Sequence, residues 1–126
     1  MIDVEKLVTH WRNGALSSWE DALYLIKGKR VMLGMFAVHL ALEKVIKAHV
    51  IKRTGSLLPK IHNLIRLAEI AKLDVDVEYR KVLAEINDFN IEGRYSDEVL
   101  SPISFKEAKV YMNRAKGTLE WLINLL

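Results

Sequence analysis

Apolar residues recur every three or four positions along most of the chain, which is the spacing of one face of an α-helix. In the first segment this spacing passes through Gly14 without a break, and Gly28 follows it. Ser17 and Glu20 could instead form a capping box that restarts the helix. The unbroken stripe favours one long helix that ends at Gly28. Its repeating positions are Val4, Val8, Trp11, Ala15, Trp19, Ala22 and Ile26.

The segment at residues 29–53 differs from the first, because residues 31–42 are apolar on nearly every side. This pattern is typical of a helix that is covered on more than one side. One neighbouring helix would not cover so much apolar surface, so we also expect a homodimer. The Thr-Gly-Ser run at residues 54–56 breaks the pattern, and Pro59 cannot continue a helix.

Two further apolar patterns predict a short helix and then a longer one. The short helix follows Pro59, and its apolar side consists of Ile61, Leu64, Ile65 and Ala68. Either Asp74 or Asp76 could cap the longer helix, and we expect Gly93 to end it. The inward residues of the longer helix are Val82, Leu83, Ile86 and Phe89.

The last helix has the clearest signals, since Ser104 and Glu107 have the spacing of a capping box. Its apolar seam consists of Phe105, Ala108, Met112, Ala115, Leu119, Leu122 and Leu126. This spacing indicates packing rather than a cofactor site. The sequence has no alternating β pattern and no internal repeat, so we expect residues 1–126 to form a single all-α domain. The fold expected is an antiparallel up-and-down bundle of four long helices plus one short helix.

Composition narrows the classes of function. The chain has 126 residues and no cysteine, so disulfides, thiolate catalysis and cysteine-based zinc sites are excluded. No two of the four histidines have the helical i, i+4 spacing, and we expect no metal and no cofactor. The longest apolar run, VMLGMFAV, is too short to cross a bilayer, and the amphipathic start is unlike a signal peptide, so we expect a cytoplasmic protein with no membrane partner. The net charge of +3 mildly favours a partner that carries phosphate.

The first candidate for chemistry lies in the second helix, where His39, Glu43 and Lys47 follow one another at i, i+4. Charged groups inside an apolar stripe are costly unless they are paired. The three residues therefore predict either an internal Glu43–Lys47 ion pair with His39 hydrogen-bonded nearby, or a ligand site or dimer interface. We expect Lys44 to point elsewhere, into solvent.

Two more candidates follow along the chain. His62 opens the short helix, where unpaired N–H groups favour an anion; the alternative is a capping or core histidine. In the connection after Gly93, Arg94 offers a planar fork for phosphate or carboxylate. Tyr95 offers a stacking face, and Asp97 could orient the arginine. The alternative is a connection that fastens itself to the bundle through an Arg94–Asp97 pair.

These candidates occur within an ordered set of motifs. The runs FAVHLALEKVIKA from Phe36, PKIHNL from Pro59 and RYSD from Arg94 follow one another along the chain. In this order and spacing they resemble the prokaryotic branch of the HEPN domain family, over nearly the whole chain. Two departures stand out. His39 begins a His-Leu pair where the family usually has two glutamines, and Ser96 replaces a proline, so no role for those amides carries over.

The resemblance implies a helical bundle that commonly forms a dimer. Many prokaryotic HEPN proteins are encoded beside a minimal nucleotidyltransferase and act with it as a two-part system, often a toxin and its antitoxin. The implied partner here is a nucleotide or a nucleotidyltransferase protein. Arg94 would then contact phosphate and Tyr95 would stack on a base, while His62, Glu43 and Lys47 complete the polar lining.

The resemblance also raises the possibility of an enzyme, because some branches of the family are ribonucleases. Those branches carry an arginine that is followed, after four to six residues, by a histidine. No histidine falls in that window after any arginine of this chain, so we assign no catalytic residue. Two other hypotheses stay open. One is a metal-independent RNase, with RNA as substrate, His62 or His39 as general base and Arg94 stabilising charge on phosphate. The other is a purely structural helical dimer.

Overall fold

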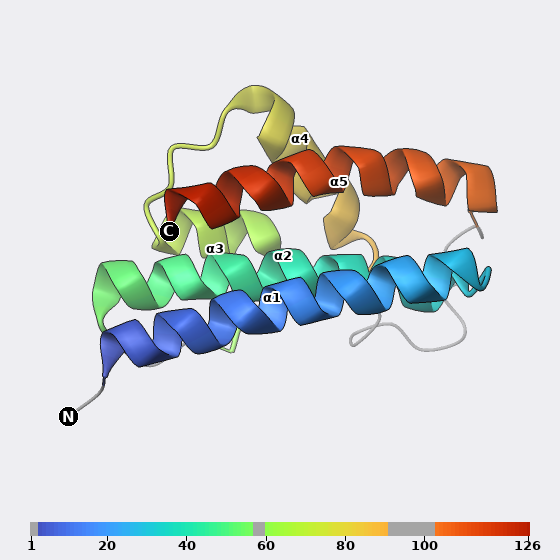
Figure 1. The fold of residues 1–126 in the computed structure, drawn as a ribbon. Helices are drawn as coiled ribbons and strands as arrows, with labels where there is room; N and C mark the ends of the chain where they lie inside the picture. Colours follow the sequence, from blue (N-terminus) through green and yellow to red (C-terminus); the bar gives the residue numbers. More distant parts are fainter. Residues whose placement is uncertain (1–2, 57–59, 91–102) are drawn as a thin grey trace.

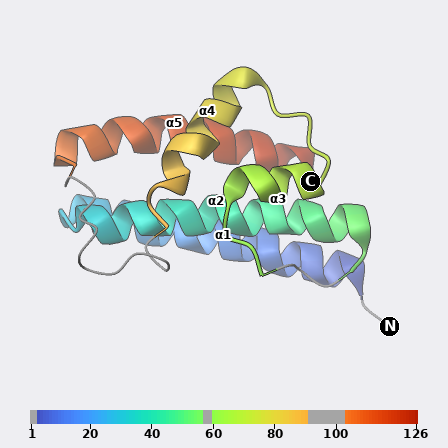
Figure 2. The same ribbon diagram turned by 180° about the vertical axis from the view of Figure 1, so that it is seen from behind.

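Five helices make up the part of the chain that the computed structural model describes, residues 3–56, 60–90 and 103–126. Figure 1 shows α1 and α2 side by side, with α5 along the bundle beyond α2. Figure 2 shows α3 and α4 on the face opposite α1, where α4 crosses steeply between α2 and α5. The all-α fold predicted from the apolar spacing is therefore confirmed. The helices are α1 (Val4–Lys27), α2 (Val31–Thr54), α3 (Leu64–Ile70), α4 (Val77–Asn87) and α5 (Phe105–Leu125).

Three of the four ends of the two longest helices coincide with capping residues in the sequence, the exception being the start of α2. The Asp3 side chain accepts a hydrogen bond from the backbone N–H of Lys6 at 3.1 Å, which caps the start of α1. The helix continues through Gly14 to Gly28, so the single long helix is confirmed. Gly55 ends α2 in the left-handed region, with φ of 66°, where glycine carries no steric cost.

The short helix α3 is capped by two asparagines. Asn63 accepts from the backbone N–H of Arg66 at 3.0 Å, and Asn87 at the end of α4 accepts from the N–H of Leu64 at 2.8 Å. The helix begins at Leu64, so Ile61 precedes it rather than forming part of its apolar side. Because the amide of Asn87 also donates to Asn63 at 3.3 Å, α3 and α4 are fixed to each other.

The helix α4 resolves one alternative and corrects one boundary. Asp76, rather than Asp74, is its N-cap and accepts from Glu78 N–H at 2.9 Å. The helix ends at Asn87, well before Gly93. Phe89 is buried just beyond this end, so its apolar signal extended the predicted helix too far.

The predicted capping box of α5 is present. Ser104 Oγ accepts from Glu107 N–H at 3.0 Å, and Glu107 Oε1 accepts from Ser104 N–H at 3.1 Å. Most of the predicted seam is buried against the rest of the bundle, namely Ala108, Met112, Ala115, Leu119 and Leu122. The expected packing function of this face is therefore correct.

The central helix is α2, and it is covered by the other helices of the same chain. Its buried positions extend from Gly34 to Ile51 and face α1, α3, α4 and α5. A Cβ on Gly34 would lie 2.5 Å from Ile26 Cδ1, so glycine permits the close approach of α1 and α2. The other helices cover most of the apolar surface of α2, but Leu33 is 51% exposed and Phe36 and Leu40 are partly exposed, so the homodimer expected from this surface stays a prediction.

None of the described helices is both long enough and apolar enough to cross a membrane. Even α2, which is the most buried, carries a glutamate, three lysines and an arginine in its second half.

Candidate functional site

A carboxylate buried in the middle of α2 brings together four of the residues that the sequence predicts for a site. Lys47 Nζ donates to Glu43 Oε2 at 2.8 Å. The Nδ1 atom of His62 lies 3.2 Å from both carboxylate oxygens of Glu43, and Nδ1 of His39 lies 3.6 Å from Oε1. We call these four residues the Glu43 cluster.

The cluster is assembled from two elements. His39, Glu43 and Lys47 lie one turn apart on α2, so the helix itself sets their spacing. His62 comes from the segment that leads into α3. The residue after it, Asn63, caps α3 and binds α4, which fixes the backbone on which His62 is carried.

The charged centre of the cluster is buried, with Glu43 only 6% exposed and Lys47 only 7% exposed. The two charged groups lie at hydrogen-bonding distance from each other, which offsets part of the cost of removing them from water. The sequence left open an internal ion pair or a ligand site. The Glu43–Lys47 ion pair is present in the structure. A ligand could still bind next to His62.

His62 is the member of the cluster that reaches the surface, since its side chain is 40% exposed. A carboxylate accepts hydrogen bonds and does not donate them, so Nδ1 is the ring atom that carries hydrogen toward Glu43. This contact fixes the orientation of the ring. It also differs from the anion site expected at the start of the short helix, because two of the first three N–H groups of α3, those of Leu64 and Arg66, already bond to asparagine side chains.

His39 is fully buried, and neither ring nitrogen has a hydrogen-bond partner within the described part of the chain. The hydrogen bond expected for His39 is therefore not found among the described residues. Burial lowers the pKa of His39 below its ordinary value, while the Glu43 carboxylate and the His62 backbone act in the opposite direction without offsetting it. A side chain with no exposed surface makes no direct contact with a ligand in this conformation.

Trp11 on α1 completes the surroundings of Lys47, whose Nζ lies 5.8 Å from the centre of the indole ring. This is the geometry of a cation–π contact. Sequence reasoning missed Trp11 because the residue also fits the apolar stripe of α1. Another lysine of α2, Lys44, donates to Ser18 Oγ at 2.8 Å in a partly buried position. The expectation that Lys44 points into solvent is therefore wrong.

The other predicted site residues, Arg94, Tyr95 and Asp97, lie outside the described residues. Whether they approach the Glu43 cluster stays a prediction. Within the described ranges no group of three or more histidine, aspartate and glutamate side chains is arranged to hold a metal ion.

The described part of the site can supply hydrogen bonds and one exposed imidazole. Lys47 is held by Glu43 and Trp11, so its charge acts mainly within the cluster. The carboxylate of Glu43 orients His62, as a carboxylate orients the histidine of a general-base pair. The arrangement suits recognition of a polar or anionic group next to His62, and it could also serve proton transfer.

This geometry defines a class of protein: a helical bundle with a polar cluster where its central helix meets a short helix. The family model of the HEPN domain matches residues 8–125. The chain therefore belongs to the HEPN domain family.

Two solved structures share the fold. TT1696 from Thermus thermophilus has a TM-score of 0.79 and 19% sequence identity, covering 94% of this chain and 98% of that chain. ST0689, an archaeal HEPN homologue, has a TM-score of 0.72 and 19% identity, covering 91% of this chain and 93% of that chain. At this identity the likeness shows the fold alone. A comparison with curated proteins finds no match.

Proposed function

We propose that this HEPN protein is a nucleotide-associated binding module that acts with a minimal nucleotidyltransferase in a two-part system of the toxin–antitoxin type. The observation that carries the proposal is the pairing of His62 with the buried Glu43 carboxylate at 3.2 Å. A buried ion pair is a poor way to gain stability, because removing charges from water is costly. The buried Glu43–Lys47 pair lies beside the partly exposed imidazole of His62, and recognition of a ligand explains this arrangement better than stability does.

In the proposed complex, His62 contacts the ligand at the surface while Glu43 and Lys47 hold the imidazole in place from below. Arg94 contributes a bidentate contact to phosphate, Tyr95 stacks on the base, and Asp97 orients the guanidinium. The net charge of +3 favours the approach of a phosphorylated ligand. The ligand is either a free nucleotide or one carried by the nucleotidyltransferase.

Isothermal titration of the purified protein with ATP and related nucleotides tests the nucleotide-binding part. We expect saturable heat with the wild-type protein and weaker binding for His62→Ala, by about tenfold, the typical loss of a hydrogen bond to a charged group. Arg94→Ala should weaken binding at least as much, because a bidentate contact to phosphate is stronger.

A matched control replaces an exposed basic residue that is not part of the proposed site, as in Arg80→Ala on α4. Equal losses for this control and for Arg94→Ala would indicate only general attraction of anions. The absence of heat from any nucleotide would remove the free-nucleotide part of the proposal. Mixing with the nucleotidyltransferase encoded beside this chain, if one is present, and measuring a complex by light scattering tests the partner directly.

A homodimer belongs to the same proposal, and the part of the apolar surface of α2 that stays exposed supports it. Tyr24 on α1 and Leu33 on α2 are exposed beside the half-buried Phe36, around a hollow of about 330 Å³. Exposed apolar side chains grouped in this way favour contact with another protein surface. Light scattering should give twice the mass of the chain at micromolar concentration, and Leu33→Glu should restore the mass of one chain.

The second candidate function is a metal-independent RNase, and the Glu43–His62 contact favours it. A carboxylate at Nδ1 is the arrangement that orients a histidine as a general base. His39 does not fit this role because it is fully buried. Cleavage of a labelled RNA that disappears in both His62→Ala and Glu43→Gln would support the enzyme. A wild-type protein without cleavage, tested together with its partner, would exclude it.

A further inference from the structure

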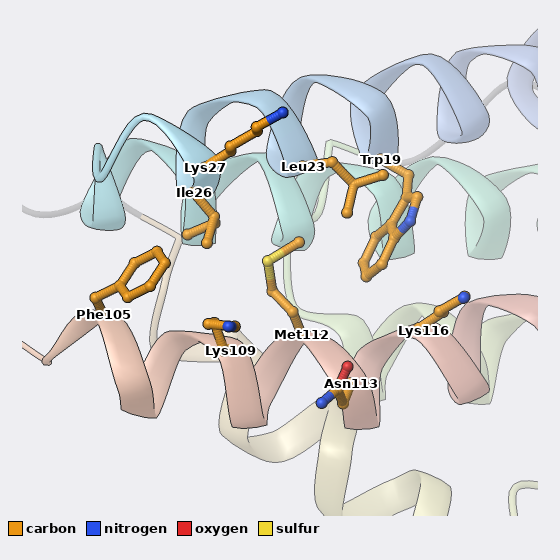
Figure 3. Close-up of a pocket in the computed structure, with 9 residues that line it drawn as sticks. All are labelled: Trp19, Leu23, Ile26, Lys27, Phe105, Lys109, Met112, Asn113 and Lys116. Carbon is orange, nitrogen blue, oxygen red and sulfur yellow. The ribbon is translucent and has the colours of Figure 1, made fainter.

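The surface between α1 and α5 contains a hollow of about 430 Å³ that shares no residue with the Glu43 cluster. Trp19 and Leu23 on α1 point toward Met112 on α5 across this hollow, and Phe105 closes one end (Figure 3). The volume lies within the range of pockets that hold small organic molecules, roughly 300–1,000 Å³. The hollow is therefore large enough for a ligand with one or two rings or a short acyl chain.

The walls of the hollow are mainly apolar. Trp19 is half-buried there, and Leu23 is 50% exposed toward it. Asn113 is the one uncharged polar side chain among the described residues that line it. Such walls have few groups that could hydrogen-bond a sugar or a base, so they suit a ligand with an apolar body rather than a nucleotide.

The rim of the hollow is cationic. Lys109 and Lys116 extend from α5 at the edge of the apolar surface, while Lys27 on α1 turns its amino group away from α5 (Figure 3). Lys109 Nζ lies 5.4 Å from the centre of the Phe105 ring, and Lys29 Nζ lies 5.8 Å from it. No carboxylate occurs among the described lining residues. Beyond the lining, Lys116 Nζ lies 4.0 Å from Oε1 of the exposed Glu120. An acidic group at the rim would thus meet the charge of Lys109 and would share that of Lys116 with Glu120.

We propose that this hollow is a second binding site, for a small amphipathic anion with an apolar aromatic or aliphatic body and a single carboxylate, sulfonate or phosphate group. The body of the ligand lies between Trp19 and Phe105 on Leu23 and Met112, and its acidic group faces Lys109 and Lys116. This site is independent of the proposed nucleotide function, because it uses other residues on other helices.

Two fluorescent probes with the same ring system but different charge test the proposal. 8-Anilinonaphthalene-1-sulfonate carries a sulfonate, and N-phenyl-1-naphthylamine is its neutral counterpart. We expect the sulfonate to bind the full chain at one site, and to bind more tightly than the neutral probe. Lys109→Gln together with Lys116→Gln should weaken the sulfonate about tenfold and leave the neutral probe within about twofold.

A negative charge placed on the apolar wall tests the location. Leu23→Glu should weaken the sulfonate at least tenfold, because the new carboxylate repels it within the hollow. Leu125→Glu is the matched control, since Leu125 is 48% exposed and lines none of the described hollows. Lys81→Gln with Lys106→Gln is the corresponding control for loss of positive charge. Circular dichroism should show unchanged helix content in all four variants.

Several outcomes would overturn the proposal. Equal weakening by Leu23→Glu and Leu125→Glu would indicate binding to exposed apolar surface in general. Unchanged sulfonate binding in the double lysine variant would remove the anion part. Absence of binding to the wild-type protein would mean that the hollow takes no such ligand, whether because a protein segment covers it or because it is too open. Weaker ATP binding in Leu23→Glu would contradict the independence of the two sites.

Discussion

The Glu43 cluster and the hollow between α1 and α5 use the same bundle to build opposite kinds of surface. In the cluster, charges are buried and paired while one imidazole reaches solvent. In the hollow, apolar side chains are open to solvent and the charges stay at the rim. The two regions should therefore respond differently to mutation: the cluster through stability, and the hollow mainly through binding.

The largest expected effect is the removal of the carboxylate. Glu43→Ala leaves the ammonium group of Lys47 buried without its anionic partner, and breaking a buried pair in this way costs about 3–5 kcal/mol. The free energy of unfolding from urea titration measures the effect. The matched control is Glu85→Ala, because Glu85 pairs with Arg114 at 2.6 Å where both side chains are partly exposed. The control should cost about 1 kcal/mol or less.

A small loss in Glu43→Ala, similar to that of Glu85→Ala, would mean that water already reaches the Lys47 amino group. The Glu43 cluster would then differ from the hollow in its residues but not in having charges that are shielded from water.

The next effect comes from acid. Burial lowers the pKa values of His39 and His49 below the ordinary 6.5 of the unfolded chain. The unfolded state therefore binds more protons below pH 6.5, and stability falls as the pH decreases from there toward the folded pKa values. Each histidine contributes at most about 1.4 kcal/mol per pH unit. Stability should be insensitive to these two groups above that pH.

Urea titrations between pH 7.5 and 5 measure this slope. Neighbouring charges also shift the two pKa values. Glu43 raises the pKa of His39 and Lys47 lowers it further. Lys52 lowers the pKa of His49 further. The hydrogen bond of His49 to the Leu122 carbonyl, at 2.8 Å, partly opposes its shift. Replacing the exposed His10 by glutamine is the control and should leave the slope unchanged. An equal slope in the wild-type protein and in a variant without His39 would contradict the assignment.

The smallest effect is a gain. His39→Leu replaces a buried ring, whose two nitrogens have no hydrogen-bond partner among the described residues, with an apolar side chain of similar size. The exchange removes an uncompensated cost of polar burial. We expect the free energy of unfolding to rise by about 1 kcal/mol, with the acid slope reduced. A loss of more than about 1 kcal/mol would show that the imidazole is paired in solution, for example through a bound water.

The sequence predicted the local part of the fold well. The capping box at Ser104 and the glycines that end α1 and α2 depend on groups close in the chain, so their spacing is enough. It failed at the end of α4, because a buried Phe89 beyond the helix gives the same apolar signal as one inside it.

The site shows the same division. The i, i+4 pair of Glu43 and Lys47 follows from helix geometry and was predicted. The contact of Glu43 with His62 and the hydrogen bond of Lys44 to Ser18 depend on how distant segments pack, and the sequence contains no direct signal for either. The HEPN resemblance supplied what spacing alone did not, since it connected His62 with α2.

The most direct test of the account is a histidine ring ¹H–¹⁵N spectrum recorded while ATP is added. If the Glu43 cluster is the nucleotide site, the ring signals of His62 move with saturation and further than those of two reference rings. These are His49, which bonds to the Leu122 carbonyl, and the exposed His10. Unchanged His62 signals at saturating ATP, or equal shifts of all three rings, would contradict a nucleotide site at this cluster.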